Sequence, residues 1–333
     1  MFTGVVLSLI VSVLFAVYAV PRKYSKQSPA LYTMWVGVAY FAGSIALCSV
    51  VWGLGLREQE NLIDMRHLLS ALRGVVWVCG TASFNIAIDK IGLVRFNQWK
   101  NFQGPIGTLL MLSFLDEVVG AKAVWLLLGM TAMFISAVLF TITWEPWERG
   151  RPRRRTIKIN GRAEGAHLQV ETRHALSLPL WLCNYTSPAI SGILYALLAA
   201  ACFGFTAFIN KIVTTQGFIY SQLLYHSLSV VVAATIIFII QTGKPKEILR
   251  VSRECLPPAM SGAMFLTATI LSIFSYTMIA GGVAWSITQL NAVWTILIGI
   301  FIFREVSFRK HRRRIISGFA FAMAAIAFLL FAL

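Results

Sequence analysis

Long apolar runs alternate with short polar segments along this sequence of 333 residues. An apolar run of about 17–25 residues can cross a lipid bilayer as one helix. The pattern predicts ten membrane-spanning helices, at residues 3–20, 30–54, 68–88, 91–115, 122–142, 189–210, 218–241, 259–280, 282–303 and 315–333. We therefore expect an all-α, polytopic membrane protein.

One polar segment is much longer than the others and divides the ten predicted spans into five and five. It runs over residues 143–188 and is strongly basic. The chain is accordingly expected to consist of a first five-helix repeat at 1–142, a basic cytoplasmic linker at 143–188 and a second five-helix repeat at 189–333.

The two halves share an internal repeat. A shift of 188 residues aligns 73–118 with 261–306 without a gap, and both segments end in an apolar run followed by Glu-Val. Six of the 46 aligned pairs are identical, and the same shift places Phe15 on Phe203. Because five is an odd number, the second repeat would enter the membrane from the opposite face. Inverted repeats of this kind are typical of secondary transporters, which bind substrate near the midplane between the repeats.

Composition and charge support a membrane protein and predict its orientation. The chain is 58% hydrophobic and 13% charged, whereas soluble domains carry about 25% charged residues. Of its 29 Lys and Arg residues, 23 fall in one set of alternate loops and five, including Arg73 and Lys211, in the other. Positively charged loops stay in the cytoplasm, so both termini are expected outside it, in a cell (inner or plasma) membrane. The net charge of +16 therefore indicates topology rather than nucleic-acid binding.

The predicted span 91–115 carries an unexpected polar cluster, FNQWKNFQGPIGT at residues 96–108. With 3.6 residues per turn, one face of this helix would combine Asn97, Lys100, Asn101, Gly104 and Thr108, with Gln98 at its border and with Trp99 and Gln103 pointing elsewhere. Exposing such groups to lipid costs several kcal/mol. The face is therefore predicted to line an aqueous cavity, although the same side chains also serve as contacts between membrane helices.

Two further expectations concern this cluster. Gly104-Pro105 removes a backbone hydrogen bond and predicts a kink just beyond the polar residues. Every Asp and Glu lies in a loop or at the end of a predicted span, so Lys100 is expected to bond to amides and carbonyls, to meet an acidic ligand, or to be held uncharged.

The repeat places a matching polar face on the predicted span 282–303. Candidate substrate-binding residues are Asn97, Gln98, Lys100 and Asn101 from the first half and Thr206, Asn210, Trp285, Ser286, Thr288, Gln289 and Asn291 from the second. Aromatic rings, those of Trp285, Trp99, Phe15 and Phe203, are expected to stack on a sugar ring. The same groups would also suit an amino acid or a nucleoside.

The carboxy-terminal residues 283–330 resemble the glucose/ribose porter family of the drug/metabolite transporter superfamily. The shared features are Ser286, Gln289 and Leu290, the Gly-Ile-Phe run at 299–301, and Glu305 followed by Arg309 and Lys310. Residues 7–29 resemble the first span of that family. The resemblance implies ten helices in two inverted repeats, no cofactor, and sugar uptake coupled to a gradient of H⁺ or Na⁺.

These observations predict a secondary active transporter that moves a small polar metabolite, with a sugar as the preferred solute. The alternatives are an exporter of amino acids or other metabolites, and a non-transporting scaffold or sensor that acts through its basic linker. No predicted span carries paired carboxylates, a His cluster or a nucleophile with a base, and the five cysteines show no metal-ligand spacing. An enzyme, a cofactor and a metal are therefore not expected; the expected partners are the solute, the bilayer and a coupling ion.

Overall fold

A computed structural model describes residues 2–56, 60–92, 96, 99–115, 121–141, 188–243, 253–303 and 308–332. Regular structure in these ranges is helical, as predicted. The predicted linker 143–188 lies outside the described residues, except for Pro188 at the start of a helix.

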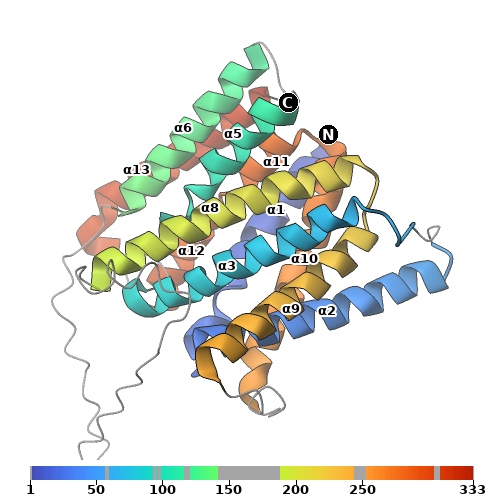
Figure 1. Ribbon diagram of the computed structural model, residues 1–333. Helices are drawn as coiled ribbons and strands as arrows, with labels where there is room; N and C mark the ends of the chain where they lie inside the picture. Colours follow the sequence, from blue (N-terminus) through green and yellow to red (C-terminus); the bar gives the residue numbers. More distant parts are fainter. Residues whose placement is uncertain are drawn as a thin grey trace, which may run out of the picture.

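The helices follow the predicted spans (Figure 1). They are α1 (Phe2–Val17), α2 (Pro29–Gly53), α3 (His67–Ile91), α5 (Gln103–Leu115), α6 (Ala121–Thr141), α8 (Pro188–Thr215), α9 (Ser221–Thr242), α10 (Leu256–Met278), α11 (Gly281–Thr288), α12 (Asn291–Phe301) and α13 (Phe308–Phe331), with short 3₁₀ turns at Pro21–Tyr24 and Arg253–Cys255. In the described ranges, nine helical segments are long and apolar enough to cross a membrane, with α11 and α12 together forming one of them. α5 is apolar but shorter.

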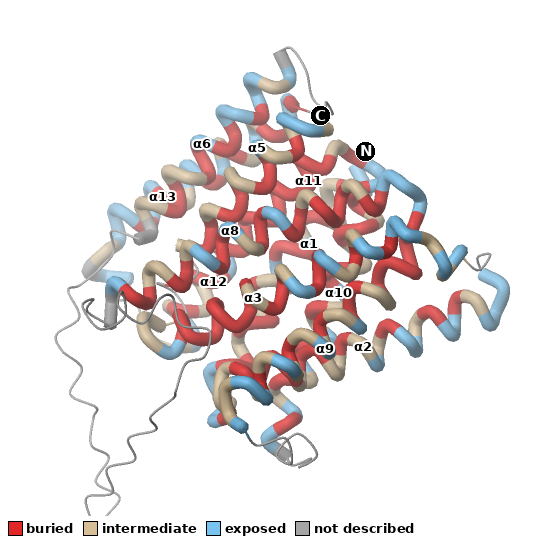
Figure 2. Tube along the Cα trace, in the orientation of Figure 1, coloured by how far each residue is buried: buried red, intermediate tan, exposed pale blue. Residues whose placement is uncertain are grey.

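Helices of the first half pack mainly on helices of the second. α3 lies against α8 and α9, while α10 lies against α1 and α2. α2 also packs on α9, and α6 on α13. The buried residues concentrate on the helices in the middle of the bundle (Figure 2). The core is therefore shared between the halves.

Two glycines bring helix backbones into direct contact. A Cβ at Gly74 on α3 would lie 2.5 Å from the backbone oxygen of His226 on α9. A Cβ at Gly262 on α10 would lie 2.6 Å from the backbone oxygen of Val36 on α2. Small residues permit such close crossings, which membrane helices use because lipid provides little hydrophobic drive for association.

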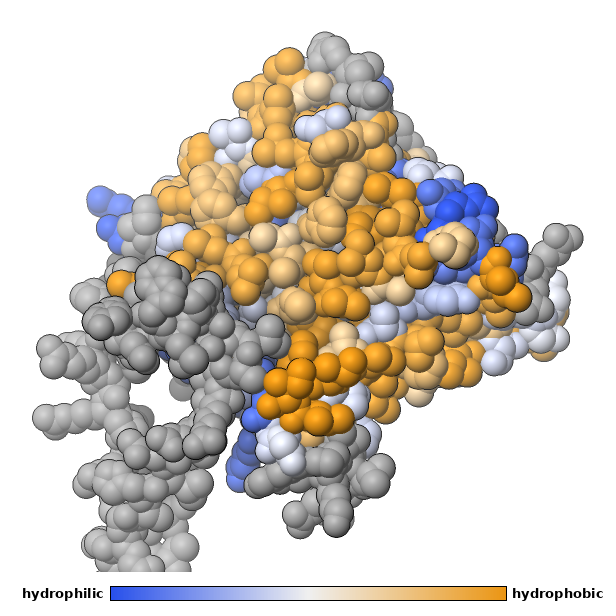
Figure 3. Space-filling view, in the orientation of Figure 1, coloured by the Kyte–Doolittle hydropathy of each residue, from blue (hydrophilic) through white to orange (hydrophobic). Residues whose placement is uncertain are grey.

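The outer face of the bundle is apolar. On α9, for example, Val232, Ile236 and Ile240 are 49%, 51% and 65% exposed. Hydrophobic residues cover the middle of the visible face in Figure 3, and hydrophilic residues gather towards its edges. Such a surface is stable in hydrocarbon, where helices satisfy their own backbone groups, and the chain is accordingly a multi-pass membrane protein.

The predicted continuous helix 91–115 is interrupted. Asn101 and Phe102 form a turn, and α5 begins only at Gln103. Pro105 explains this position, because it has no N–H to donate to the oxygen of Asn101 and its ring clashes with that carbonyl. The oxygen of Asn101 instead accepts from the nitrogen of Gly104 at 3.1 Å. The interruption thus precedes the Gly104-Pro105 pair, which lies in the first turn of α5, whereas the sequence analysis placed the kink beyond the polar cluster.

The predicted helix 282–303 is also interrupted, at Gln289 and Leu290 between α11 and α12. No proline is present here; side chains instead accommodate the break. The oxygen of Trp285 accepts from Thr288 Oγ1 at 2.7 Å and from Gln289 Nε2 at 3.1 Å, and the oxygen of Thr288 accepts from Asn291 Nδ2 at 3.0 Å. The two turns, 101–102 and 289–290, are 188 residues apart.

The two ends of the chain lie at the same end of the bundle (Figure 1). Val5 and Leu9 near one terminus and Leu329 and Ala332 near the other join a single hydrophobic cluster. This agrees with an even number of membrane crossings.

Candidate functional site

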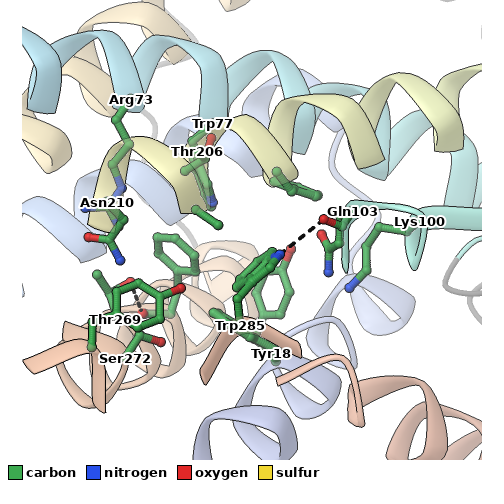
Figure 4. A pocket seen from close by; sticks show the side chains of 15 residues that line it. Tyr18, Arg73, Trp77, Lys100, Gln103, Thr206, Asn210, Thr269, Ser272 and Trp285 are labelled. Atoms are coloured by element: carbon green, nitrogen blue, oxygen red, sulfur yellow. Dashed lines mark hydrogen bonds between the residues drawn. The ribbon is translucent and has the colours of Figure 1, made fainter. Parts of the chain in front are cut away.

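A pocket lies between the two halves of the bundle (Figure 4). Its empty volume, including the part open to solvent, is about 560 Å³. It is lined by Phe15 and Tyr18 at the end of α1, Arg73 and Trp77 of α3, Lys100 and Gln103 at the start of α5, Phe203, Thr206, Ala207 and Asn210 of α8, Phe265, Thr269, Ser272 and Tyr276 of α10, and Trp285 of α11.

Four predicted site residues line this pocket: Lys100, Thr206, Asn210 and Trp285. Gln103, which the helical projection directed elsewhere, lines it too. The difference follows from the turn at 101–102, because a projection that assumes one continuous helix is wrong beyond a break.

The other predicted site residues of the second half serve mainly to join the broken helices. Thr288, Gln289 and Asn291 bond to backbone oxygens around the turn 289–290. Ser286 Oγ lies 3.1 Å from Thr108 Oγ1 and so links α11 to α5. None of these four predicted residues is among those that line the pocket.

In the first half, Asn101 is 5% exposed and lies at the turn, outside the pocket lining. Both atoms of its side-chain amide are buried without a hydrogen-bond partner. Asn97 and Gln98 lie outside the described residues.

The two broken helices meet at the wall of the pocket. Gln103 Nε2 donates to Gln289 Oε1 at 3.0 Å, and Trp285 Nε1 donates to the backbone oxygen of Gln103 at 3.1 Å. A Cβ at Gly107 would lie 2.5 Å from Trp285 Nε1. The Trp285 ring is therefore held closely against α5.

Arg73 is the main residue that the sequence analysis missed. We counted it as a loop charge, but it is 3% exposed in the second turn of α3, about 9 Å from the helix start at a rise of 1.5 Å per residue. Its position inside the apolar run 68–88 was the available signal. Lys211, also counted as a loop charge, is buried in α8 and donates to the oxygen of Tyr276 at 2.8 Å.

Charge in the pocket lining is of one sign. Arg73 and Lys100 are both 3% exposed, and no lining residue is Asp, Glu or His. Arg73 Nη1 donates to Gln222 Oε1 over a long 3.5 Å, and its Nε is buried without a partner.

Aromatic rings form the middle of the pocket. Trp77 and Phe265 contact each other, with ring centroids 4.4 Å apart, and Phe15 lies 6.3 Å from Phe265. Phe15, Phe203 and Trp285 were predicted to stack on a ligand and line the pocket; Trp99 is not among the lining residues.

His226 of α9 borders this region without lining the pocket. Its Nδ1 lies 2.9 Å from the hydroxyl of Tyr40, and its Nε2 is buried without a partner. No group of His, Cys, Asp and Glu in the described ranges has an arrangement that would hold a metal ion.

No protein-family model and no curated protein matches this sequence. A solved structure described only as "Crystal structure of protein" matches it with a TM-score of 0.59 and 12% sequence identity, over 97% of this chain and 97% of that one. At this identity the likeness shows the fold alone: almost the whole helical arrangement occurs in a known structure.

Proposed function

We propose that the chain is a secondary transporter that moves a small polar metabolite by alternating access between two inverted five-helix repeats, 1–142 and 189–333. The observation that carries this proposal is the position of the pocket. It lies between the halves, and positions 188 residues apart line it in pairs: Phe15 with Phe203, Tyr18 with Thr206, and Trp77 with Phe265.

Reciprocal contacts support the inverted repeat. A Cβ at Gly4 would lie 3.0 Å from the side chain of Ile279, and a Cβ at Gly192 would lie 2.5 Å from that of Ile91. A shift of 188 residues exchanges these two contacts, because it carries position 4 to 192 and position 91 to 279. A two-fold relation between the halves accounts for such an exchange.

The interrupted helices support transport in particular. Their turns lie at equivalent positions, and Gln103 and Trp285 next to them line the pocket. Broken helices that border a central site are a recurrent feature of secondary transporters with inverted repeats. Two similar halves that share a site provide two states of similar energy, which alternating access requires.

Accessibility of the pocket from both sides of the membrane tests this function without knowledge of the solute. Thr206 is replaced by Cys in a variant whose five native cysteines are substituted, and a membrane-impermeant thiol reagent is applied to right-side-out and to inverted vesicles. We expect labelling from both sides. A Cys at Val232 on the exposed face of α9 is the matched control and should resist the reagent in both preparations.

Labelling of the Thr206→Cys variant from one side alone, however long the exposure, would refute alternating access and favour a sensor or scaffold. The direction of transport is tested separately, by the sign of solute accumulation in proteoliposomes under an imposed H⁺ or Na⁺ gradient. Uptake supports a porter, and extrusion supports an exporter.

A further inference from the structure

We propose that the solute is an organic anion whose carboxylate or phosphate binds Arg73 and whose apolar body lies between the aromatic rings of the pocket. This inference rests on the transport function proposed above and names its substrate class. It replaces the neutral sugar that the family resemblance favours.

The guanidinium of Arg73 has unused hydrogen-bonding capacity. An arginine side chain carries five N–H donors in a planar fork and keeps its charge in proteins. In the part of the chain that the structure describes, it makes one long hydrogen bond, to Gln222, and its Nε has no partner. That geometry suits an oxyanion, which the fork binds through two parallel hydrogen bonds.

Other polar groups at the same end of the pocket also lack partners. Figure 4 shows Arg73, Asn210, Thr269 and Ser272 together at one end. Asn210 Oδ1 and Ser272 Oγ are buried without a hydrogen-bond partner. Buried polar groups in proteins are normally satisfied, so this end of the pocket is built to be completed by a ligand.

The charges of the described residues exclude a protein counter-ion for Arg73. Asp89 pairs with Arg22 at 2.5 Å, and Asp64 pairs with Arg66 at 2.6 Å. Glu60 accepts hydrogen bonds from the backbone nitrogens of residues 219–221. A cation inside a membrane protein normally faces a carboxylate or a ligand, and here the ligand remains.

Lys100 lies at the opposite end of the pocket, beside Gln103 (Figure 4). A second cation in the lining disfavours a solute that carries its own ammonium, since no acidic side chain lines the pocket to receive it. Aromatic rings, Trp77 and Phe265 among them, separate the two ends. The pocket therefore fits a net anion with an apolar body better than a zwitterion or a neutral sugar.

A matched ligand series tests this assignment on the purified full chain. The probes are 3-phenylpropionate, its neutral amide 3-phenylpropionamide, the zwitterion phenylalanine, phenyl phosphate, and glucose, each measured by calorimetry in a neutral detergent. We expect the two anions to bind at least about tenfold more tightly than the amide, the zwitterion or glucose. Equal affinity of the acid and its amide, tighter binding of phenylalanine or glucose, or no binding of any probe at millimolar concentration would each overturn the proposal.

Variants locate the effect. Arg73→Gln should weaken binding of 3-phenylpropionate about 30-fold or more and leave binding of the amide nearly unchanged. Arg73→Lys keeps the charge but loses the fork, and should retain an intermediate preference for the anion. Arg66→Gln is the matched control, because Arg66 is exposed and pairs with Asp64; it should bind both probes as the unmodified chain does.

Folding and lipid effects are separated from recognition. Elution as a single species in size-exclusion chromatography accompanies each variant, and the comparison of acid with amide on the unmodified chain holds even if Arg73→Gln does not fold. A shift of the unfolding midpoint by phosphatidylglycerol, without one by soluble anions, would assign Arg73 to a lipid headgroup and overturn the proposal. Two-sided labelling at position 206 with equal binding of acid and amide rejects the anion alone, whereas anion binding with one-sided labelling rejects transport alone.

Discussion

Replacing Gly74 by Ala perturbs the closest approach of α3 to α9. The new Cβ would lie 1.9 Å from Ser229 Oγ and 2.5 Å from the backbone oxygen of His226. The serine side chain can rotate away, at the loss of its 2.8 Å hydrogen bond to the oxygen of His226. The backbone oxygen cannot, so the helices must separate by about 1 Å to reach ordinary contact.

The balance of terms is unfavourable. Overpacking costs about 1–3 kcal/mol, and contact with a backbone atom places this case at the upper end. The lost hydrogen bond adds about 1 kcal/mol, while the better helix propensity of Ala returns about 1 kcal/mol. We therefore expect a net destabilisation of about 2–3 kcal/mol, which lowers the apparent unfolding midpoint by about 5 °C.

Thermal unfolding in detergent measures this effect, and two glycines serve for comparison. Gly262→Ala should cost a similar amount, because its Cβ would lie 2.6 Å from the oxygen of Val36. Gly53→Ala should leave the midpoint unchanged or raise it, since nothing lies within 4 Å of its Cβ. Midpoints of Gly74→Ala and Gly262→Ala equal to that of Gly53→Ala would refute the close helix contact. A large effect at one of the two alone would contradict the equivalence of the two crossings.

Three further predictions address the site, the linker and the outer loops. Gly107→Ala should displace the Trp285 ring, whose Nε1 would lie 2.5 Å from the new Cβ, and should weaken ligand binding about tenfold in calorimetry; unchanged affinity would show that this ring does not shape the site. Deletion of 150–175 should leave transport in proteoliposomes largely intact, and its abolition would support the scaffold alternative. The hydrogen bond from the side chain of Arg66 lowers the pKa of Asp64 to about 2. Because this pKa is depressed, any stability from the pair is present above the usual value of about 3.9 and is lost only as the pH falls towards 2; NMR of the carboxyl carbon should show the Asp64 pKa rising towards 3.9 in Arg66→Gln.

The positions of the helices could be predicted from the sequence because hydrocarbon imposes a simple rule on length and polarity. The interruptions could not. A polar run such as SITQLN at 286–291 reads equally as the lining of a cavity and as a set of side chains that bond to freed backbone oxygens. In the structure Thr288, Gln289 and Asn291 do the second.

The candidate site was found in part for a related reason. Lys100, Thr206, Asn210 and Trp285 were chosen by helical periodicity, and they line the pocket. Arg73 was missed because a charge near the end of an apolar run is normally assigned to the membrane surface. Its depth depends on how α3 packs against α8 and α9, which a hydropathy pattern does not encode.

The meeting of both chain ends at one end of the bundle has a consequence for engineering. A short peptide that joins residue 332 to residue 2 would close the chain, and new termini opened between 142 and 187 would produce a circular permutant that begins with α8. Since α3 packs on α8 and α9, and α10 on α1 and α2, whichever half is synthesised first, the order of the halves along the gene is not part of what defines the fold. Two separately expressed polypeptides should assemble into the same bundle.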